Sequence, residues 1–155
     1  MLSLVAAGFV LKSCFRGEEA RIRSHLSKLE ELVSFPADES RLQSVANAKR
    51  LSELFAEDVS VEINVAGFQD ARAGGRKEVM QAALAIRNRI GSLKASLHDV
   101  TVQLSGDEQT AKVEATGRAK VAERDSSAVE DFVFYFRKVD KSWLIERIEN
   151  SQTFR

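Results

Sequence analysis

The sequence predicts an α+β domain in which about three helices pack in a strongly curved antiparallel sheet. Apolar residues recur at helical spacing in the first half of the chain, and in the second half they alternate with polar residues, as in strands with one covered face. The clearest signal is Val129–Phe154, where two runs rich in aromatic and β-branched residues flank the short segment Val139–Ser142. This pattern is typical of a β-hairpin with a short loop, and we expect it at the centre of the sheet.

Length and composition fit one soluble globular domain. The chain has 155 residues, of which 44% are hydrophobic and 30% are charged. Its 23 basic residues balance its 23 acidic residues, and the two signs are interleaved along the chain. A nucleic-acid-binding protein normally carries a basic excess or stripe, so we expect no nucleic-acid partner.

The content of cysteine and histidine argues against metal sites. A single cysteine allows no internal disulfide and no cysteine-based zinc site. The two histidines do not fall at ligand spacing with a carboxylate. We therefore expect neither a metal nor another cofactor.

The apolar run Leu2–Leu11 precedes the domain and is open to three interpretations. As a helix it extends about 15 Å, half of a hydrocarbon core of about 30 Å, so it does not cross a membrane unaided. It can be the apolar part of a secretory signal whose basic start lies upstream. It can also be a helix that packs on its own domain or on a second copy.

The remaining interpretation involves Cys14. With Leu11 and Ser13 it resembles a bacterial lipoprotein box, in which the cysteine is lipidated after cleavage, although Lys12 replaces the small or apolar residue usual there. We thus predict an apolar segment over residues 1–17, for export, anchoring or packing, and the folded domain over 18–155. We expect membrane attachment through residues 1–14 at the periplasmic face of a bacterial envelope, with a cytoplasmic location as the alternative.

The spacing of apolar residues predicts three helices. The first is expected over 18–34 and ends at Phe35-Pro36, because the residue before a proline is driven out of the helical region. The second is capped by Asp38 or Ser40, whose side chains accept hydrogen bonds from free amides of the first turn. The third ends at Gly91. The residues expected on the three buried faces are, in order, Ile22, Leu26, Leu29 and Val33; Leu42, Val45, Ala46, Leu51, Leu54 and Phe55; and Val79, Ala83, Ile86 and Ile90.

Strands are predicted where apolar and polar residues alternate. The first is Asp58–Val65, and a loop over Ala66–Gly75 follows it. Two more are expected at His98–Leu104 and Thr110–Glu123, before the hairpin. The apolar side of Thr110–Glu123 carries small residues, which leave room for a bulky neighbour or a ligand: Ala111, Ala115, Gly117 and Ala119.

The order of these elements resembles the NTF2-like superfamily, also called the SnoaL-like or cystatin-like α+β cone. Leu54–Val59 looks like the family's passage from second helix to first strand, and Gly75–Val79 like its entry to the third helix. Gly106–Val113 and Phe136–Ile145 resemble its two later hairpins. The resemblance covers roughly Ile22–Phe154 and implies a sheet wrapped around the helices, with a conical pocket. Members of the family include isomerases and dehydratases for hydrophobic ring compounds, ligand-binding proteins and dimerisation modules.

Few residues can do chemistry in such a pocket. A resemblance to ketosteroid isomerase or scytalone dehydratase implies a general base in an apolar pocket and a donor for an oxyanion. Candidates for the base are His98, expected on the apolar face of its strand, Asp70 and Glu62. Tyr135, the only tyrosine, is the candidate donor, although the strand register leaves its direction open. The residues expected to line the pocket are Phe55, Met80, Ala115, Gly117, Tyr135 and Trp143.

Two further features are expected to be structural. His25 lies beside the apolar stripe of the first helix, where a packing residue is more common than a base. Phe132, Phe134 and Phe136 fall at strand period and belong to the core.

The sequence leaves three hypotheses for function. The leading one is a non-enzymatic domain that binds a hydrophobic small molecule or a protein. The alternative is an isomerase or hydro-lyase that acts on a hydrophobic ring substrate. The third is a structural homodimer.

Overall fold

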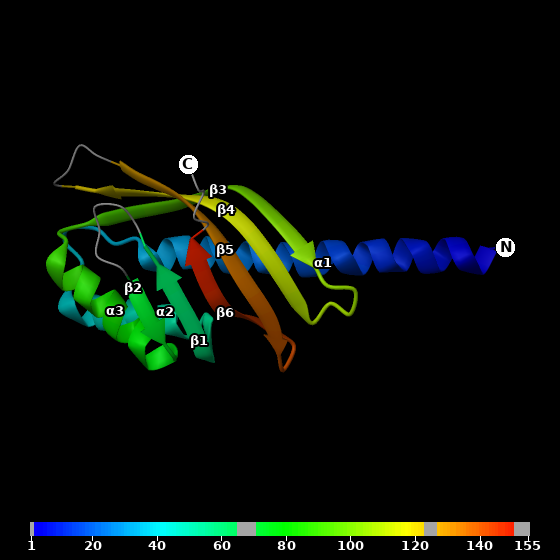
Figure 1. The fold of residues 1–155 in the computed structure, drawn as a ribbon, viewed down its shortest axis with the longest axis horizontal. Coiled ribbons are helices and arrows are strands. Elements are labelled where there is room, and N and C mark those ends of the chain that lie inside the picture. Colours follow the sequence, from blue (N-terminus) through cyan, green and yellow to red (C-terminus); the bar gives the residue numbers. More distant parts are fainter. Residues whose placement is uncertain (1, 65–70, 123–126, 151–155) are drawn as a thin grey trace.

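The structure is a computed structural model that describes residues 2–64, 71–122 and 127–150, with side chains from residue 16 onward. Within these residues it forms the α+β cone predicted from the sequence, with the sheet bent around α1 (Figure 1). The elements are α1 (Leu2–Val33), α2 (Arg41–Ser52), β1 (Phe55–Ile63), β2 (Ala71–Gly74), α3 (Arg76–Arg89), β3 (Leu93–Leu104), β4 (Thr110–Val121), β5 (Ser127–Val139) and β6 (Ser142–Asn150).

The six strands form one sheet in the order β2-β1-β6-β5-β4-β3. The sheet is mixed rather than wholly antiparallel, because β1 and β6 run parallel while the other neighbours are antiparallel. The predicted hairpin, β5 and β6, takes the two middle positions. Asp140 and Lys141 form its turn at φ values of 47° and 67°, and two successive positive φ values are typical of a two-residue type I′ turn.

The first helix is longer than the sequence predicted. It begins at Leu2 instead of residue 18, so the apolar run and the first helix of the domain form one continuous helix of 32 residues. Figure 1 shows its N-terminal part extending beyond the sheet. Among the described residues, we find no helix that combines the length and the apolar character of a membrane span. The side chain of Cys14 lies outside the described part, and its lipidation stays a prediction.

The second helix buries a smaller face than expected. Ser40, one of the two predicted caps, forms a capping box with Gln43. Leu42 and Val45, both expected in the core, are 82% and 43% exposed. The buried side chains belong to the C-terminal half of the helix, next to Phe55, which begins β1 instead of ending α2. They are Ala48, Leu51 and Ser52.

The core lies between α1 and the concave face of the sheet. Ile22 on α1 and Phe136 and Ile145 on the central hairpin are fully buried. Phe134 is also buried and Phe132 packs against the same cluster, so the phenylalanine row is part of the core as predicted. Burial of such side chains typically contributes about 1.5–3 kcal/mol each.

The edge strand β3 is completed by side chains of α1. The carboxylate of Glu30 accepts a hydrogen bond from the backbone N–H of Leu97 at 2.6 Å. The hydroxyl oxygen of Ser34 accepts another from the N–H of Ala95 at 3.0 Å. These bonds satisfy N–H groups on the free side of β3, where a further strand would otherwise pair.

The contact between α1 and β3 extends further in both directions along the chain. Arg23 donates from Nη2 to the carbonyl oxygen of Val100 at 3.1 Å. Past the C-terminus of α1, Phe35 and Leu93 exchange two backbone hydrogen bonds of 2.9 and 3.0 Å. The helix is therefore bonded to β3 from Leu93 to Val100, which closes the open side of the cone.

Replacing Glu30 with alanine tests this closure. We expect Glu30→Ala to lower the free energy of unfolding by about 1–3 kcal/mol, because the N–H of Leu97 loses a charged acceptor. Glu30→Gln keeps an acceptor and should cost less. Urea denaturation of the variants measures both changes. The exposed neighbour Glu31→Ala is the matched control, and an equal loss in Glu30→Ala and Glu31→Ala would contradict the assignment.

Candidate functional site

An open groove of about 480 Å³ lies where the end of α1 meets the start of β3 and the end of β4. The helix ends at Val33 and does not continue through Phe35-Pro36, because the residue before a proline is driven out of the helical region. The lining of the groove is mainly apolar, with two serines and two lysines. The lining residues are Ser34, Phe35, Pro36, Ala37, Ser92, Leu93, Lys94, Lys120 and Ala122.

Phe35 holds this groove in place. Its backbone pairs with Leu93, and its ring is buried. The guanidinium of Arg87 on α3 lies 4.9 Å from the centre of that ring, within the range of a cation–π contact. Phe35 therefore joins α1, β3 and α3 at one point.

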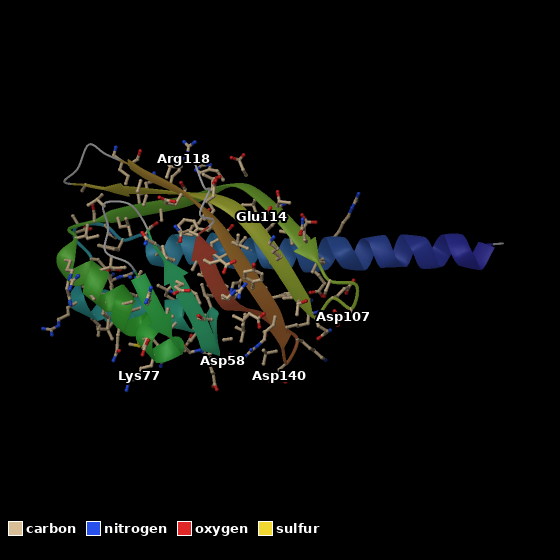
Figure 2. All side chains as sticks on the ribbon, in the orientation of Figure 1. Asp58, Lys77, Asp107, Glu114, Arg118 and Asp140 are labelled. Atoms are coloured by element: carbon tan, nitrogen blue, oxygen red, sulfur yellow. The ribbon has the colours of Figure 1, made fainter. Side chains whose placement is uncertain are left out.

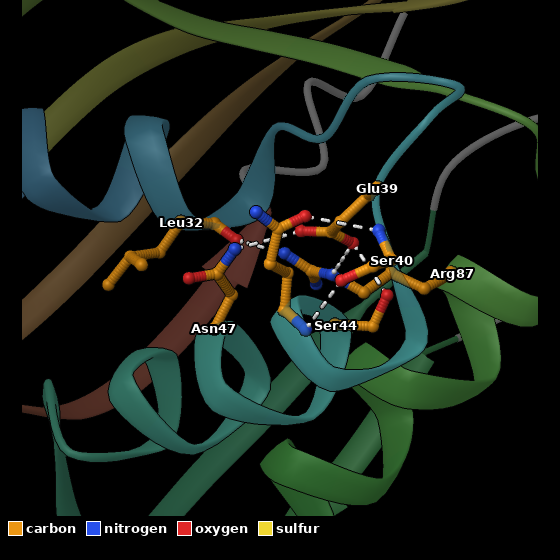
Figure 3. A network of polar contacts seen from close by, with 7 residues as sticks. Leu32, Glu39, Ser40, Ser44, Asn47 and Arg87 are labelled. Carbon is orange, nitrogen blue, oxygen red and sulfur yellow. Dashed lines mark hydrogen bonds and ion pairs between the residues drawn. The ribbon is translucent and has the colours of Figure 1, made fainter.

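Arg87 also belongs to a buried polar network with Leu32, Glu39, Ser44 and Asn47 (Figure 3). The side chains of Arg87 and Glu39 are only 3% and 7% exposed. Nε of Arg87 donates a hydrogen bond of 3.0 Å to a carboxylate oxygen of Glu39. Nη2 of Arg87 donates to the carbonyl oxygen of Leu32 at 2.6 Å. Glu39 also accepts hydrogen bonds from Ser44 and Asn47 on α2, each at 2.8 Å.

This network fixes the loop that carries the groove. Burial raises the pKa of Glu39, but hydrogen bonds from Asn47 and Ser44 and the charge of Arg87 outweigh it, so the pKa lies below its usual value. Glu39 is therefore ionised at neutral pH, and its bonds reach α2 and α3. A buried pair of this kind is better evidence for a fixed geometry than for added stability.

His25 is a titratable side chain of α1 that packs against the core. Its Nε2 lies 2.9 Å from the carbonyl oxygen of Leu54, and because a carbonyl only accepts, Nε2 carries the hydrogen. The ring packs edge-on against Phe136, with ring centres 5.5 Å apart. Burial lowers the pKa of His25 and the charge of Lys28 lowers it further, against the raising effect of the Leu54 bond. His25 is thus a neutral packing residue with one nitrogen engaged.

The small residues of β4 face the core as predicted, but a side chain of the protein occupies the space beside them. An ideal Cβ on Gly117 would lie 2.5 and 2.8 Å from two ring atoms of Phe132 on β5. Only a residue without a Cβ allows this close approach. Phe132 is therefore the bulky neighbour for which the small residues of β4 leave room.

His98 does not face the core. The register of β3 against β4 shifts between His98 and Thr101, and Asp99 adopts a φ of 53°. Such a β-bulge adds one residue to a strand and reverses the inward and outward alternation after it. Val100 therefore packs on the core while His98 is exposed, with its Nε2 2.9 Å from the hydroxyl of Ser96. The expectation that His98 lies on the apolar face was wrong for this reason.

Tyr135 also lies on the outer face, so it does not line the core. It alternates with the buried Phe134 and Phe136, and its hydroxyl donates to Glu149 on β6 at 3.0 Å. The guanidinium of Arg147 stacks over its ring at 4.1 Å. This cluster faces away from the helices.

The other residues predicted for the site lie either on the outer face of the sheet or in the core. Glu62 is exposed on the outer side, 3.6 Å from Arg72, and Asp70 lies outside the described residues. The remaining residues expected to line a pocket do face the core, where they are packed: Phe55, Met80, Ala115, Gly117 and Trp143. In the part of the chain that the structure describes, no group of three or more potential ligands is placed to hold a metal ion.

Trp143 has a polar partner that the sequence did not reveal. Its indole N–H donates to Glu18 on α1 at 2.6 Å, and the ammonium of Lys138 lies 3.1 Å from the same carboxylate oxygen. Burial raises the pKa of Glu18, yet the bonds from Trp143 and Lys138 bring it below its usual value. The ion pair ties the hairpin to the middle of α1.

Comparison with known proteins identifies the fold. No protein-family model and no curated protein matches the sequence. An NTF2-like protein with a cystatin-like fold from Novosphingobium aromaticivorans is 22% identical, with 99% of this chain and 91% of that one covered and a TM-score of 0.67. An NTF2-like protein of unknown function from Pseudomonas putida is 14% identical, with 90% and 89% covered and a TM-score of 0.69.

A scytalone dehydratase-like protein of Novosphingobium aromaticivorans is 16% identical, with 92% of this chain and 89% of that one covered and a TM-score of 0.67. The chain therefore has the NTF2-like, cystatin-like fold that the sequence predicted. Identities of this size establish the fold, and activity depends on the residues placed on it.

The contact between Gly117 and Phe132 can be tested by a double-mutant cycle. Gly117→Ala should lower the free energy of unfolding by about 1–3 kcal/mol, because the new methyl group displaces the ring of Phe132. With Phe132→Ala already present, the same glycine substitution should cost much less. Urea denaturation of the wild type, both single variants and the double variant measures the coupling. Additive losses would contradict the close approach.

The lowered pKa of His25 predicts a pH dependence of stability. Because the folded pKa lies below the ordinary value of 6.5, the unfolded chain takes up the proton first as the pH falls. Stability should therefore decrease below about pH 6.5, before Glu18 and Glu39 titrate from an ordinary value of 4.5. His25→Gln keeps a donor for Leu54 without a titrating ring, so it should flatten this decrease.

The measurement is the free energy of unfolding in urea across this pH range. His98→Gln, which removes the other histidine from the outer surface, is the matched control. Identical pH profiles for the wild type and His25→Gln would refute the assignment.

Proposed function

We propose that this protein is a non-enzymatic binding module and that it holds an apolar small molecule in the groove beside Phe35. The observation that carries the proposal is the groove itself. Its volume of about 480 Å³ falls in the range of about 300–1,000 Å³ that is typical of small-molecule sites. Its mainly apolar lining suits a hydrophobic ligand, and its two lysines and Ser92 provide polar contacts.

The rigidity around the groove supports the same proposal. Phe35 is held by Leu93 through backbone bonds and by Arg87 through its ring. The loop that follows is held by the buried pair of Glu39 and Arg87. A site that is already formed loses little conformational entropy when a ligand enters it.

The competing hypothesis is an isomerase or hydro-lyase for a hydrophobic ring substrate, and it rests on the similarity to the scytalone dehydratase-like protein. A reaction of that class needs a base and a donor that converge on the substrate. Of the four candidates, Asp70 lies outside the described residues, and His98, Glu62 and Tyr135 lie on the outer face of the sheet, where they do not converge on the core. We therefore favour binding over catalysis.

Titration with the neutral dye N-phenylnaphthylamine, whose fluorescence rises in apolar sites, tests the proposal. The wild type should bind the dye, and Ala37→Trp should weaken binding by about tenfold or more, because the indole fills the groove. Ala37 is exposed, so the fold should tolerate the change. Ala85→Trp, on the exposed side of α3, is the matched control and should bind as the wild type does.

Each outcome decides between the alternatives. No dye binding, or equal binding by Ala37→Trp and the wild type, would argue against a site in the groove. Turnover of a ring substrate by the wild type that disappears in His98→Gln would support the enzymatic alternative instead.

A further inference from the structure

Two lysines face each other beside the groove, on the outer side of the sheet. In the register of β3 and β4, Lys94 is directly opposite Lys120, and both side chains are exposed and line the groove. Arg118 lies two residues along β4 on the same face (Figure 2). Among the described residues, none of these three basic side chains forms an ion pair.

This arrangement lowers the stability of the sheet. Like charges at directly opposite positions of neighbouring strands repel each other. On its other side, Lys120 is opposite the uncharged Ser127 of β5. Further along the same face of β4, Lys112 does have an acidic partner, because its ammonium lies 3.1 Å from the carboxylate of Glu114. Within the part of the chain that the structure describes, no carboxylate compensates the lysine pair at the groove.

Protection of the sheet edge does not explain the pair. Lysines are common on edge strands because they prevent pairing with another chain. The free edge beside Lys94 is already covered, since Leu93 is bonded to Phe35 and Ala95 to Ser34. The pair therefore adds repulsion at a position that needs no protection.

We propose that the groove takes a free anionic amphiphile, a single-chain carboxylic acid whose carboxylate lies between Lys94 and Lys120. Its hydrocarbon chain would lie along Pro36, Ala37 and Ala122, which are exposed and line the groove. The carboxylate would relieve the repulsion between the two ammonium groups and accept charge-assisted hydrogen bonds from them. This inference rests on the proposed function and specifies its ligand.

A free ligand fits the surroundings better than a membrane surface does. Recognition of anionic bilayers normally requires a cluster of roughly four to eight basic residues. Here three basic side chains gather at one end of a single strand pair, beside a groove sized for a small molecule.

Isothermal titration calorimetry with decanoate and with decanol tests the inference. The wild type should bind decanoate about tenfold more tightly than decanol, and the double variant Lys94→Gln/Lys120→Gln should lose that preference while it retains decanol binding. Raising the salt concentration should weaken decanoate binding only. Lys112→Gln is the matched control and should bind both ligands as the wild type does.

Thermal unfolding without ligand gives a second readout. Because the repulsion is removed, Lys94→Gln/Lys120→Gln should unfold at the same temperature as the wild type or higher. A lower unfolding temperature would show that the lysines support the fold and would overturn the inference.

The binding outcomes separate the two proposals. Equal affinity of the wild type for decanoate and decanol would overturn the anionic preference and leave the groove as a neutral binding site. Binding of neither would overturn both. If Lys112→Gln lost as much decanoate affinity as Lys94→Gln/Lys120→Gln, the decanoate preference would reflect the overall charge of the protein. Binding to phosphatidylglycerol vesicles that needs Lys94 and Lys120, without binding of free decanoate, would assign the pair to a membrane and overturn the inference.

Discussion

The closure of the sheet by α1 is the constraint on which the rest of the structure depends. Arg23, Glu30 and Ser34 are spaced so that they share one stripe of the helix, and all three bond to the backbone of β3. The apolar stripe beside them, which includes Ile22 and Leu26, packs inside the cone. These two stripes together fix how the helix is rotated about its axis. A small rotation would break the edge bonds and expose core residues at the same time.

The groove is a consequence of this closure. Because α1 is bonded to β3 up to its last turn, the chain leaves the helix at the edge of the sheet, where Phe35 forms its bridge to Leu93. The proline that follows prevents the helix from continuing. Glu39 and Arg87 then hold the loop against α2 and α3. The site thus requires both the local stop signal in Phe35-Pro36 and contacts that are distant in the sequence.

Alternation in the sequence predicted side-chain direction only where the strands are regular. The inward and outward residues of β4 follow the predicted pattern because its pairing with β5 has no register shift. In β3 the bulge at Asp99 reverses the pattern, and this change moved His98 from the expected inner face to the outer face. A bulge needs only one residue in an unusual conformation, and aspartate adopts that conformation readily. Periodicity alone therefore does not show on which side of a bulge a residue falls.

Contacts between distant segments account for what else the sequence did not show. Glu39 and Arg87 are 48 residues apart, and each lies in a segment that reads as an ordinary solvated helix end or loop. Lys94 and Lys120 become neighbours only through the register of β3 against β4. By contrast, the helix stop at Phe35-Pro36 is local and was predicted from two residues.

The position of Phe132 favours the proposed site at the rim of this cone over one inside it. The missing side chain of Gly117 leaves space in the core that a ligand could occupy, and the ring of Phe132 fills that space. Close packing of this kind leaves no room for a guest without moving the central strands. The open groove lies instead at the end of α1, beside Phe35 and Leu93. A core filled by its own aromatic residues therefore supports the proposal of a site at the rim, where the end of α1 meets β3.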